Sequence, residues 1–243
     1  MTMRLNCDLG EGFGQWQIHT DVLAMPHIDM ANIACGFHAS DPLTMSQTVQ
    51  LAKANSVSIG AHPGYPDLIG FGRRSMAMKH DELISTVVYQ VGALQAIAKI
   101  HGVSVDYIKP HGAMYNDMMV NSEVFNAVIQ ACELLSLPLM VLAGEACERY
   151  INTGVNQSVS LLKEGFCDRR YSNSGALLPR SHPKGVLTDS SDILQQAIEM
   201  SKGYVTTVEG DRLALSIDSL CVHGDNSTSV ALIAKIRNQI KGE

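Results

Sequence analysis

Residues 5–12 of this 243-residue chain are Leu5-Asn6-Cys7-Asp8-Leu9-Gly10-Glu11-Gly12, an apolar run that ends in acidic and glycine residues. Five later segments have the same form, with polar side chains placed where a run typical of a β-strand ends. They are residues 34–41, 60–67, 108–116, 164–170 and 221–226. Parallel strands of an α/β fold deliver their C-terminal ends to one face, where such proteins bind ligands. The six segments therefore predict one composite site built by the whole chain.

Between these segments, strand patterns alternate with helix patterns. The predicted strands are residues 3–8, 28–36, 57–61, 105–109, 138–143, 159–166 and 217–223. The predicted helices are residues 43–55, 80–101, 121–136, 145–152, 189–202 and 226–241. Asn121 and Asp189 are predicted N-caps, and Gly102 is a predicted C-cap. The alternation implies parallel strands joined by right-handed crossovers.

The same alternation predicts the fold class. No linker, repeat or break in composition divides the sequence, so we expect one domain over residues 1–243. An open, doubly wound sheet gathers its ligand site at one switch point. Site-like residues after nearly every strand instead favour an irregular β/α barrel of about seven parallel strands.

Composition and charge exclude several classes of function. Lys and Arg total 18 against 24 Asp and Glu, a net charge of −6, so we expect no nucleic-acid partner. No apolar stretch approaches the ~20 residues that cross a bilayer, and the amino terminus enters a strand without a signal peptide. We therefore expect a cytoplasmic protein with no membrane partner. The six cysteines contain no C-x-x-C pair, so neither a structural zinc site nor a disulfide framework is expected.

Strand geometry indicates which of the polar side chains share a face. Residues two apart on a strand point the same way. The pairs related in this way are Asn6 with Asp8, Lys109 with His111, and His223 with Asp225. If these faces are interior, the barrel mouth gathers them with His62, while Glu11 and His38 lie on adjoining loops. Such a cluster suits general acid–base chemistry or metal binding.

Arginines near the same segments indicate an anionic substrate. Arg73 and Arg74 follow the His62 segment, and Arg169 follows Asp168. Guanidinium groups match the geometry of carboxylate and phosphate. The chain contains neither a Walker A loop nor a G-x-G-x-x-G loop, so its glycines predict no nucleotide site.

The motifs, taken together, resemble a known family. They are Asn6 to Glu11, Asn32 to Pro42, Gly60 to Arg74, Lys109 to Asn116, and Val222 to Asp225, and the resemblance runs the full length. They resemble the LamB/YcsF family, which supplies one of the components of bacterial ATP-dependent 5-oxoprolinase. The chain departs from the family pattern at Asn226-Ser227, where the family usually has Thr-Pro. It also has Cys167 where alanine is common, and residues 171–175 lack an acid often found there.

The resemblance implies a fold and a reaction. The fold would be a distorted β/α barrel similar to that of polysaccharide deacetylases. The reaction would be cleavage of 5-oxoproline, an anionic lactam, to L-glutamate, coupled to ATP hydrolysis in a complex with two further subunits, B and C. ATP would be a co-substrate of the complex. Because this chain has no recognisable nucleotide loop, we expect the partner subunits to bind most of the ATP.

Roles for individual residues follow from the resemblance and from their chemistry. The expected catalytic residues are Asp8, His62, Lys109, His111 and Asp225. The expected substrate-binding residues are Asn6, Glu11, His38, Arg73, Arg74, Asn116, Arg169 and His223. Asp8 or Asp225 would act as a base. The histidines would orient or protonate the substrate, and Lys109 and Arg74 would bind the anion.

Two other functions fit the same residues. One is metal-dependent deacetylation or amide hydrolysis, with Asp8, His62 and His111 as metal ligands. The H-x-x-x-H pairing usual in such enzymes is absent after His62, so we expect a site short of ligands and no tightly bound zinc. The other is a non-catalytic component that organises its partners, and the cluster of titratable residues argues against it.

Overall fold

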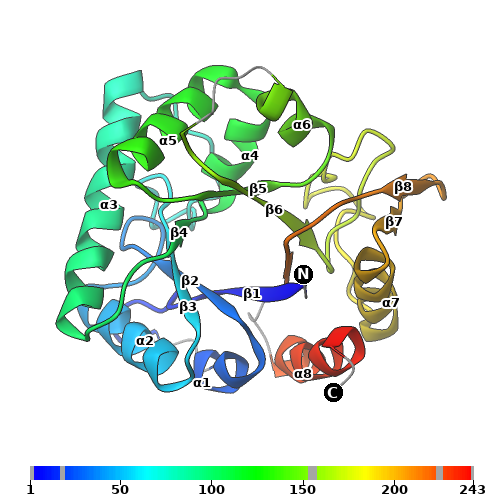
Figure 1. The fold of residues 1–243 in the computed structure, drawn as a ribbon, viewed down its shortest axis with the longest axis horizontal. Coiled ribbons are helices and arrows are strands. Elements are labelled where there is room, and N and C mark those ends of the chain that lie inside the picture. Colours follow the sequence, from blue (N-terminus) through cyan, green and yellow to red (C-terminus); the bar gives the residue numbers. More distant parts are fainter. Residues whose placement is uncertain (1–2, 17–19, 153–157, 223–226, 242–243) are drawn as a thin grey trace.

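The computed structural model describes residues 3–16, 20–152, 158–222 and 227–241, and its central element is a closed barrel of parallel strands (Figure 1). The strands are, in barrel order, β1 (Arg4–Leu9), β2 (Met30–Ala34), β3 (Ser58–His62), β4 (Tyr107–Ile108), β5 (Leu139–Leu142), β6 (Leu161–Phe166) and β9 (Ser219–Cys221). Strand β9 pairs with both β6 and β1 and so closes the sheet. The predicted irregular barrel of about seven parallel strands is confirmed, and each observed strand overlaps a predicted one.

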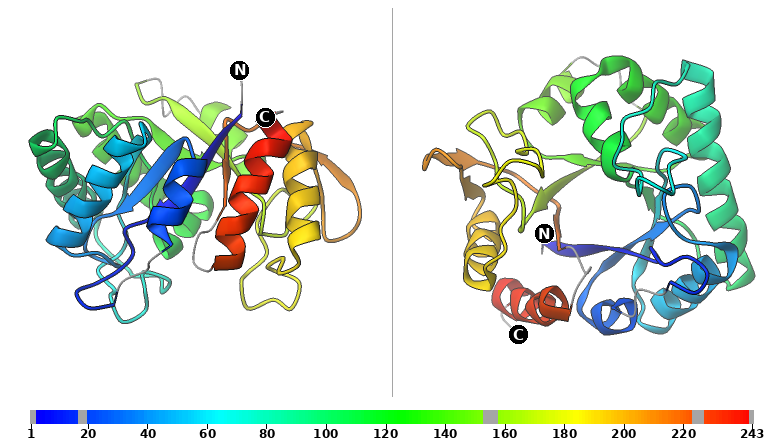
Figure 2. Two further views of the ribbon diagram at one scale, coloured as in Figure 1. Left: turned by 90° about the horizontal axis from the view of Figure 1, so that it is seen from below. Right: turned by 180° about the vertical axis from the view of Figure 1, so that it is seen from behind.

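Helices surround the barrel on the outside (Figures 1 and 2). The six that the sequence predicts are α2 (Pro42–Ala54), α3 (His80–Ile100), α5 (Ser122–Leu135), α6 (Glu145–Asn152), α7 (Ser190–Ser201) and α8 (Ser227–Lys241). The predicted N-caps are confirmed. The side chain of Asn121 accepts from the Glu123 N–H at 2.9 Å, and Asp189 accepts from the Ser191 N–H at 2.7 Å. Each cap satisfies a backbone donor that the first helical turn leaves unpaired.

Several short elements are not predicted by the sequence. They are α1 (Asp21–Ala24), the 3₁₀ turn Met25–His27, α4 (Gly112–Val120), and the antiparallel pair β7 (Tyr204–Thr206) and β8 (Arg212–Ala214). Most of them span only three or four residues, too few for a periodic pattern to emerge. Helix α4 begins at a glycine with φ of +53°, a residue type and conformation that indicate a loop rather than a helix.

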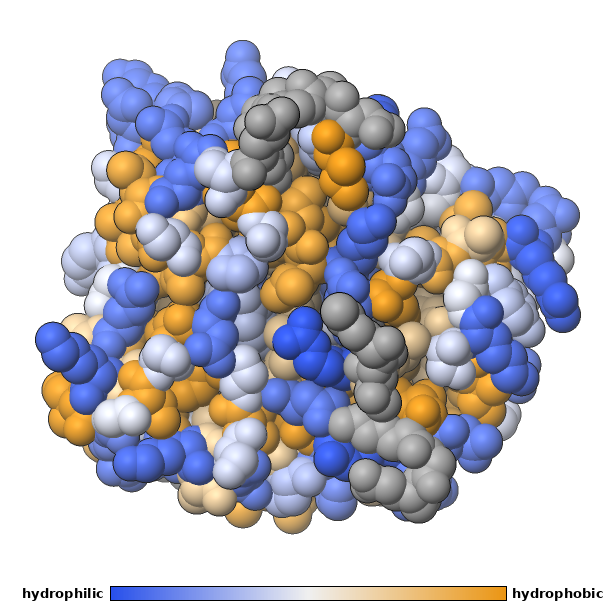
Figure 3. Space-filling view, in the orientation of Figure 1, coloured by the Kyte–Doolittle hydropathy of each residue, from blue (hydrophilic) through white to orange (hydrophobic). Residues whose placement is uncertain are grey.

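The loops that follow the strands gather at one end of the barrel. In the left view of Figure 2, the loops after β1, β3 and β6 lie at the bottom, whereas the start of β1 and the end of α8 lie at the top. Figure 3 shows the latter end, where hydrophilic and hydrophobic side chains are interspersed over the surface. The C-terminal ends of the strands therefore share one face, as an α/β barrel requires.

The barrel interior is apolar at one level and polar at the next. Most of the buried apolar side chains pack between the strands and the outer helices. A small second cluster inside the barrel consists of Met30, Tyr107 and Met140 with Leu162 packed against them. Two residues further along three of these strands stand Asn32, Lys109 and Glu164, which are also buried. The interior thus changes from hydrocarbon to hydrogen-bonding groups toward the loop end.

Helix α3 is long and apolar enough to cross a membrane by length and composition. The expectation that no segment reaches that length is therefore wrong for this helix. Its residues Leu83, Val87, Val91 and Leu94 are buried, and the helix packs against α5 and α2 in the outer ring. We assign it as a covering helix of the barrel, because its most apolar face is already buried against other elements.

Gly60 on β3 provides a test of packing inside the barrel. A Cβ added there would overlap the ring of Tyr107, which is fully buried and donates its hydroxyl to Asn32 Oδ1 at 2.6 Å. We expect Gly60→Ala to lower the free energy of unfolding by about 3 kcal/mol, measured by urea denaturation.

Gly92 in α3 is the matched control, since an added Cβ meets nothing within 4 Å. Gly92→Ala should raise stability by roughly 0.5–1 kcal/mol. Equal effects of the two substitutions would contradict the packing argument.

Candidate functional site

A cavity of about 810 Å³ opens at the loop end of the barrel. Its lining includes Asp8, Glu11, His62, Lys109 and His111. The predicted gathering of Asp8, His62 and His111 in one cavity is confirmed, and their part in catalysis stays a prediction. The predicted site residues His223 and Asp225 lie outside the described residues.

Lys109 forms the floor of the cavity and is only 2 % exposed. Its Nζ lies 2.8 Å from Asp8 Oδ1 and 2.8 Å from Glu164 Oε1. Burial acts to lower the pKa of Lys109, but the neighbouring acids outweigh it and the pKa is raised well above its usual value. The ammonium therefore stays charged and binds two carboxylates from opposite parts of the barrel wall.

Two buried amides orient the same carboxylate. Asn32 donates from Nδ2 to both Asn6 Oδ1 and Asp8 Oδ1 at 2.8 Å, and Asn6 donates to Ser219 Oγ at 2.8 Å. The predicted shared face of Asn6 and Asp8 is confirmed. Because Oδ1 of Asp8 receives both Lys109 and Asn32, the carboxylate is fixed in one orientation. Its other oxygen, Oδ2, lies 3.4 Å from His62 Nε2.

His62 and His111 form a pair whose tautomers the backbone defines. His62 Nδ1 lies 2.6 Å from the carbonyl oxygen of Lys109, and His111 Nε2 lies 2.9 Å from the carbonyl oxygen of Phe71. A carbonyl oxygen can only accept, so each of these nitrogens carries the hydrogen. The remaining nitrogens, His62 Nε2 and His111 Nδ1, face each other at 3.0 Å. In the neutral rings both of these atoms present a lone pair.

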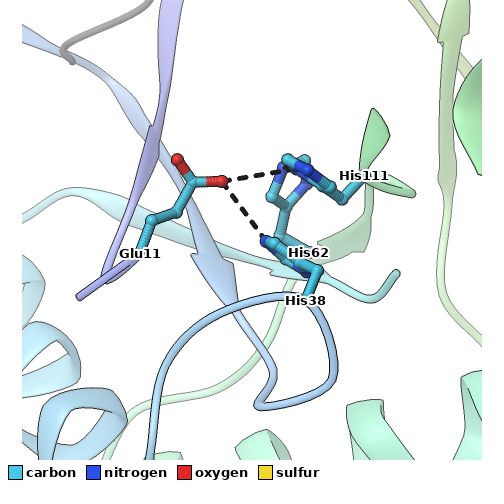
Figure 4. A group of neighbouring side chains, drawn as sticks. All are labelled: Glu11, His38, His62 and His111. Carbon is cyan, nitrogen blue, oxygen red and sulfur yellow. Dashed lines mark hydrogen bonds and ion pairs between the residues drawn. The ribbon is translucent and has the colours of Figure 1, made fainter. Parts of the chain in front are cut away.

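Glu11 and His38 complete this group (Figure 4). Glu11 Oε1 lies 3.2 Å from His38 Nε2 and 3.3 Å from His111 Nδ1. The His38 and His111 rings stack with centroids 3.7 Å apart and planes 4° from parallel. One ligand atom from each of Glu11, His38, His62 and His111 lies within 4.8 Å of all the others. The expectation of a site short of ligands is therefore wrong, because loops after other strands supply them.

Burial keeps two of the three imidazoles neutral. Burial lowers the pKa of His38 well below its usual value, and the nearby His62 adds to this effect. The pKa of His111 is likewise lowered well below its usual value, by burial first and then by His38 and His62. Neutral imidazoles can accept a proton or bind a metal ion through a ring nitrogen.

The loop between β3 and α3 packs its backbone directly against these rings. A Cβ on Gly72 would come within 2.7 Å of His38 Cβ and 2.8 Å of His111 Cδ2. A Cβ on Gly64 would lie 2.8 Å from His38 Nδ1. Phe71 adopts a left-handed φ of +54° and directs its carbonyl to His111. This loop therefore orients the histidines, which is a further use for glycines that the sequence left open between tight turns and an anion pocket.

The predicted substrate-binding residues divide into two groups. Arg73, Asn116 and Arg169 line the cavity, and Arg169 is 6 % exposed with its pKa lowered to about 10 by burial and then by Arg180. Arg74 is absent from the lining and instead pairs with Asp67, with Nε 2.9 Å from Oδ2. The cavity thus presents guanidinium groups from two different loops.

A model of the LamB/YcsF family matches residues 3–243. The chain belongs to the LamB/YcsF family. It is 52 % identical over 239 residues to a 5-oxoprolinase component, the A chain of that enzyme in Vibrio parahaemolyticus, covering 98 % of this chain and 95 % of that protein. It is 48 % identical over 236 residues to a protein of the same name from Pseudomonas aeruginosa, covering 96 % and 94 % of the two chains. The predicted family is therefore confirmed.

Solved structures agree with the LamB/YcsF assignment. The crystal structure of a lactam utilization protein from Thermus thermophilus superposes with a TM-score of 0.91 at 36 % identity, covering 100 % of this chain and 97 % of that one. A putative cellobiose-phosphate cleavage protein from Enterococcus faecalis superposes with a TM-score of 0.55 at 13 % identity, covering 99 % and 94 %. The second likeness concerns the fold alone.

Sequence reasoning missed two acids at this LamB/YcsF site. Glu164 begins one of the six segments but is not among the predicted site residues, although an acid between Leu162 and Phe166 on one face of a strand indicates a buried carboxylate. Asp21 lines the cavity and accepts from the Gly10 N–H at 2.8 Å. No motif marks Asp21, because it begins a helix of only four residues.

Asp21 predicts a dependence of stability on pH. Burial raises its pKa from 3.8 to about 6, so the folded state holds a proton that the unfolded state releases between those values. Its contribution is favourable below pH 4 and is lost as the pH rises through 6. Asp21→Asn cannot titrate, so its stability relative to the unsubstituted chain should rise by about 1–3 kcal/mol from pH 4 to pH 7. Urea unfolding at both pH values measures this, and a difference that does not change with pH would contradict it.

Proposed function

We propose that this chain is the 5-oxoproline-binding component of an ATP-dependent 5-oxoprolinase, a hydrolase of cyclic amides. The complex would open the lactam of 5-oxo-L-proline to L-glutamate while hydrolysing ATP to ADP and phosphate. Relatives named as components of 5-oxoprolinase match nearly the whole chain at about half identity, which supports the role of this family member. The observation within the site that carries the proposal is a fixed carboxylate, Asp8, beside neutral imidazoles in a cavity lined by arginines.

The chemistry of the lactam gives ATP a purpose. An amide is a poor electrophile, and opening of this unstrained five-membered ring is unfavourable without coupling. Transfer of the terminal phosphoryl group of ATP to the amide oxygen would convert that oxygen into a leaving group. Water would then add to the carbon, the carbon–nitrogen bond would break to give the free amine, and phosphate would be released. The cavity would hold the lactam or this phosphorylated form.

Asp8 is the residue that we propose as the base. Its Oδ1 receives hydrogen bonds from Lys109 and Asn32, so its orientation is fixed, and Oδ2 is directed toward His62. A fixed carboxylate beside the substrate can take the proton of the attacking water. His62 and His111 would orient the amide or protonate the leaving nitrogen.

The proposed roles of the cationic residues change with the geometry. Lys109 lies between two carboxylates, so we propose that it orients Asp8 rather than binds the substrate anion. Arg74 is paired with Asp67, which leaves Arg73 and Arg169 as the cavity-lining arginines from the predicted set. These two would recognise the carboxylate of 5-oxoproline or the transferred phosphoryl group.

We propose that the chain depends on partners for its use of ATP. No phosphate-binding loop of the known sequence patterns occurs in it. The word subunit in the names of its relatives implies a multi-subunit complex, and we propose that subunits B and C bind most of the ATP. We also propose that the complex works in the cytoplasm, where ATP is abundant.

Substitution of Asp8 tests its role. Asp8→Asn preserves size and the contact with Asn32 but removes the charge, so we expect turnover of the reconstituted complex to fall by roughly 10²-fold or more. The substituted chain should remain folded by circular dichroism. Asp192→Asn, which changes an exposed acid on α7, is the matched control and should leave turnover unchanged. Near-normal turnover by Asp8→Asn would exclude Asp8 as the base.

The division of labour between the components is tested by reconstitution. We expect the isolated chain neither to hydrolyse ATP nor to form glutamate from 5-oxoproline at a useful rate, and addition of subunits B and C to restore both together. Release of glutamate and of phosphate is measured for the chain alone and for the complex. Rapid glutamate formation by the chain alone would refute the proposed dependence on partners.

A further inference from the structure

The side chains at the ends of the first four strands point toward one another. Glu11 follows β1, His38 follows β2, His62 is the last residue of β3, and His111 follows β4 (Figure 4). Neighbouring strands of a barrel therefore each contribute one donor atom to the same small space. Three imidazole nitrogens and one carboxylate oxygen are a donor set typical of zinc and related transition-metal ions.

The hydrogen-bond pattern of two of these rings favours an ion over a hydrogen bond between them. The carbonyls of Lys109 and Phe71 require N–H on His62 Nδ1 and on His111 Nε2. The facing nitrogens, 3.0 Å apart, are then both acceptors in the neutral rings and cannot hydrogen bond to each other. A backbone carbonyl that receives the outer N–H is also the usual support of a metal-bound histidine, because it fixes the ring and its tautomer.

The spacing of the donor atoms matches a coordination sphere. Two ligands at zinc–ligand distances of about 2.0–2.1 Å and a tetrahedral angle lie roughly 3.3 Å apart. The observed separations are 3.0 Å for His62 Nε2 to His111 Nδ1, 3.2 Å for Glu11 Oε1 to His38 Nε2, and 3.3 Å for Glu11 Oε1 to His111 Nδ1. Every other pair in the group is within 4.8 Å. Small rotations of the His38 and His62 rings would bring all four atoms to one ion.

We propose a binding site for one divalent first-row transition-metal ion of the zinc class, with the ligands Glu11, His38, His62 and His111. Asp8 is not a ligand in this arrangement and instead lies beside His62, held by Lys109 and Asn32. The ion would polarise the bond under attack, a task otherwise left to the imidazoles, and Asp8 would remain the base. Binding of the ion does not depend on the proposed lactam reaction.

Metal titration of the isolated chain tests the site. The chain is stripped with a chelator, dialysed, and titrated with ZnCl₂ by calorimetry and with CoCl₂ by visible absorption. We expect one ion per chain, a zinc dissociation constant of about 1 μM or tighter, and the visible bands of cobalt bound by imidazole nitrogens. Millimolar MgCl₂ should not compete, because magnesium prefers oxygen ligands.

Variants identify the ligands. His38→Ala should weaken zinc binding by at least roughly 100-fold, and zinc should no longer raise its melting temperature. His80→Ala removes an exposed histidine at the start of α3 and should bind zinc like the unsubstituted chain. Asp8→Asn should still bind one ion, which separates this ligand set from one made of Asp8, His62 and His111. Circular dichroism confirms that each variant is folded.

Two results would overturn the proposal. One is the absence of both zinc heat and cobalt bands in the folded, unsubstituted chain. The other is unchanged zinc affinity in folded His38→Ala. Neither measurement uses ATP, 5-oxoproline or the partner proteins, so failure of the metal site and failure of the proposed reaction would be told apart.

Discussion

The ammonium group of Lys109, buried between Asp8 and Glu164, is the interaction on which the rest of the site depends. A charge removed from water is tolerated only when opposite charges and hydrogen bonds surround it. Here the three partners come from β1, β6 and the end of β4, so one ion cluster connects distant parts of the barrel wall. Removal of any one partner would leave an uncompensated charge in a closed interior.

This cluster separates two environments along the barrel axis. On one side lies the apolar group of Met30, Tyr107 and Met140, which fills the interior with hydrocarbon. On the other side lie the imidazoles and Glu11, next to the cavity. Between them, the amide of Asn32 links the hydroxyl of Tyr107 to Asp8 through hydrogen bonds of 2.6 and 2.8 Å. The orientation of Asp8 is therefore fixed by contacts that begin well below the cavity.

The imidazoles are fixed from the opposite direction, by backbone. Carbonyl oxygens of Lys109 and Phe71 hold the outer nitrogens of His62 and His111, and Gly72 permits the loop to lie against the rings. Side chains that are oriented in advance lose little freedom when a ligand binds, which favours both catalysis and metal binding. The left-handed φ of Phe71 is the strain that accompanies this arrangement.

The sequence by itself determined the seven barrel strands, the six longer outer helices, the shared face of Asn6 and Asp8, and the family. These features depend on local patterns: apolar runs, caps such as Asn121 and Asp189, and alternation along a strand. Only the tertiary structure decided which side chains meet. Glu11 and His38 join His62 and His111 because four different strand ends converge, and no spacing within one segment reports such a convergence. In the same way Glu164 becomes the partner of Lys109, and Arg74 turns to Asp67 instead of the cavity, because closure of the barrel fixes distances between residues far apart in the chain.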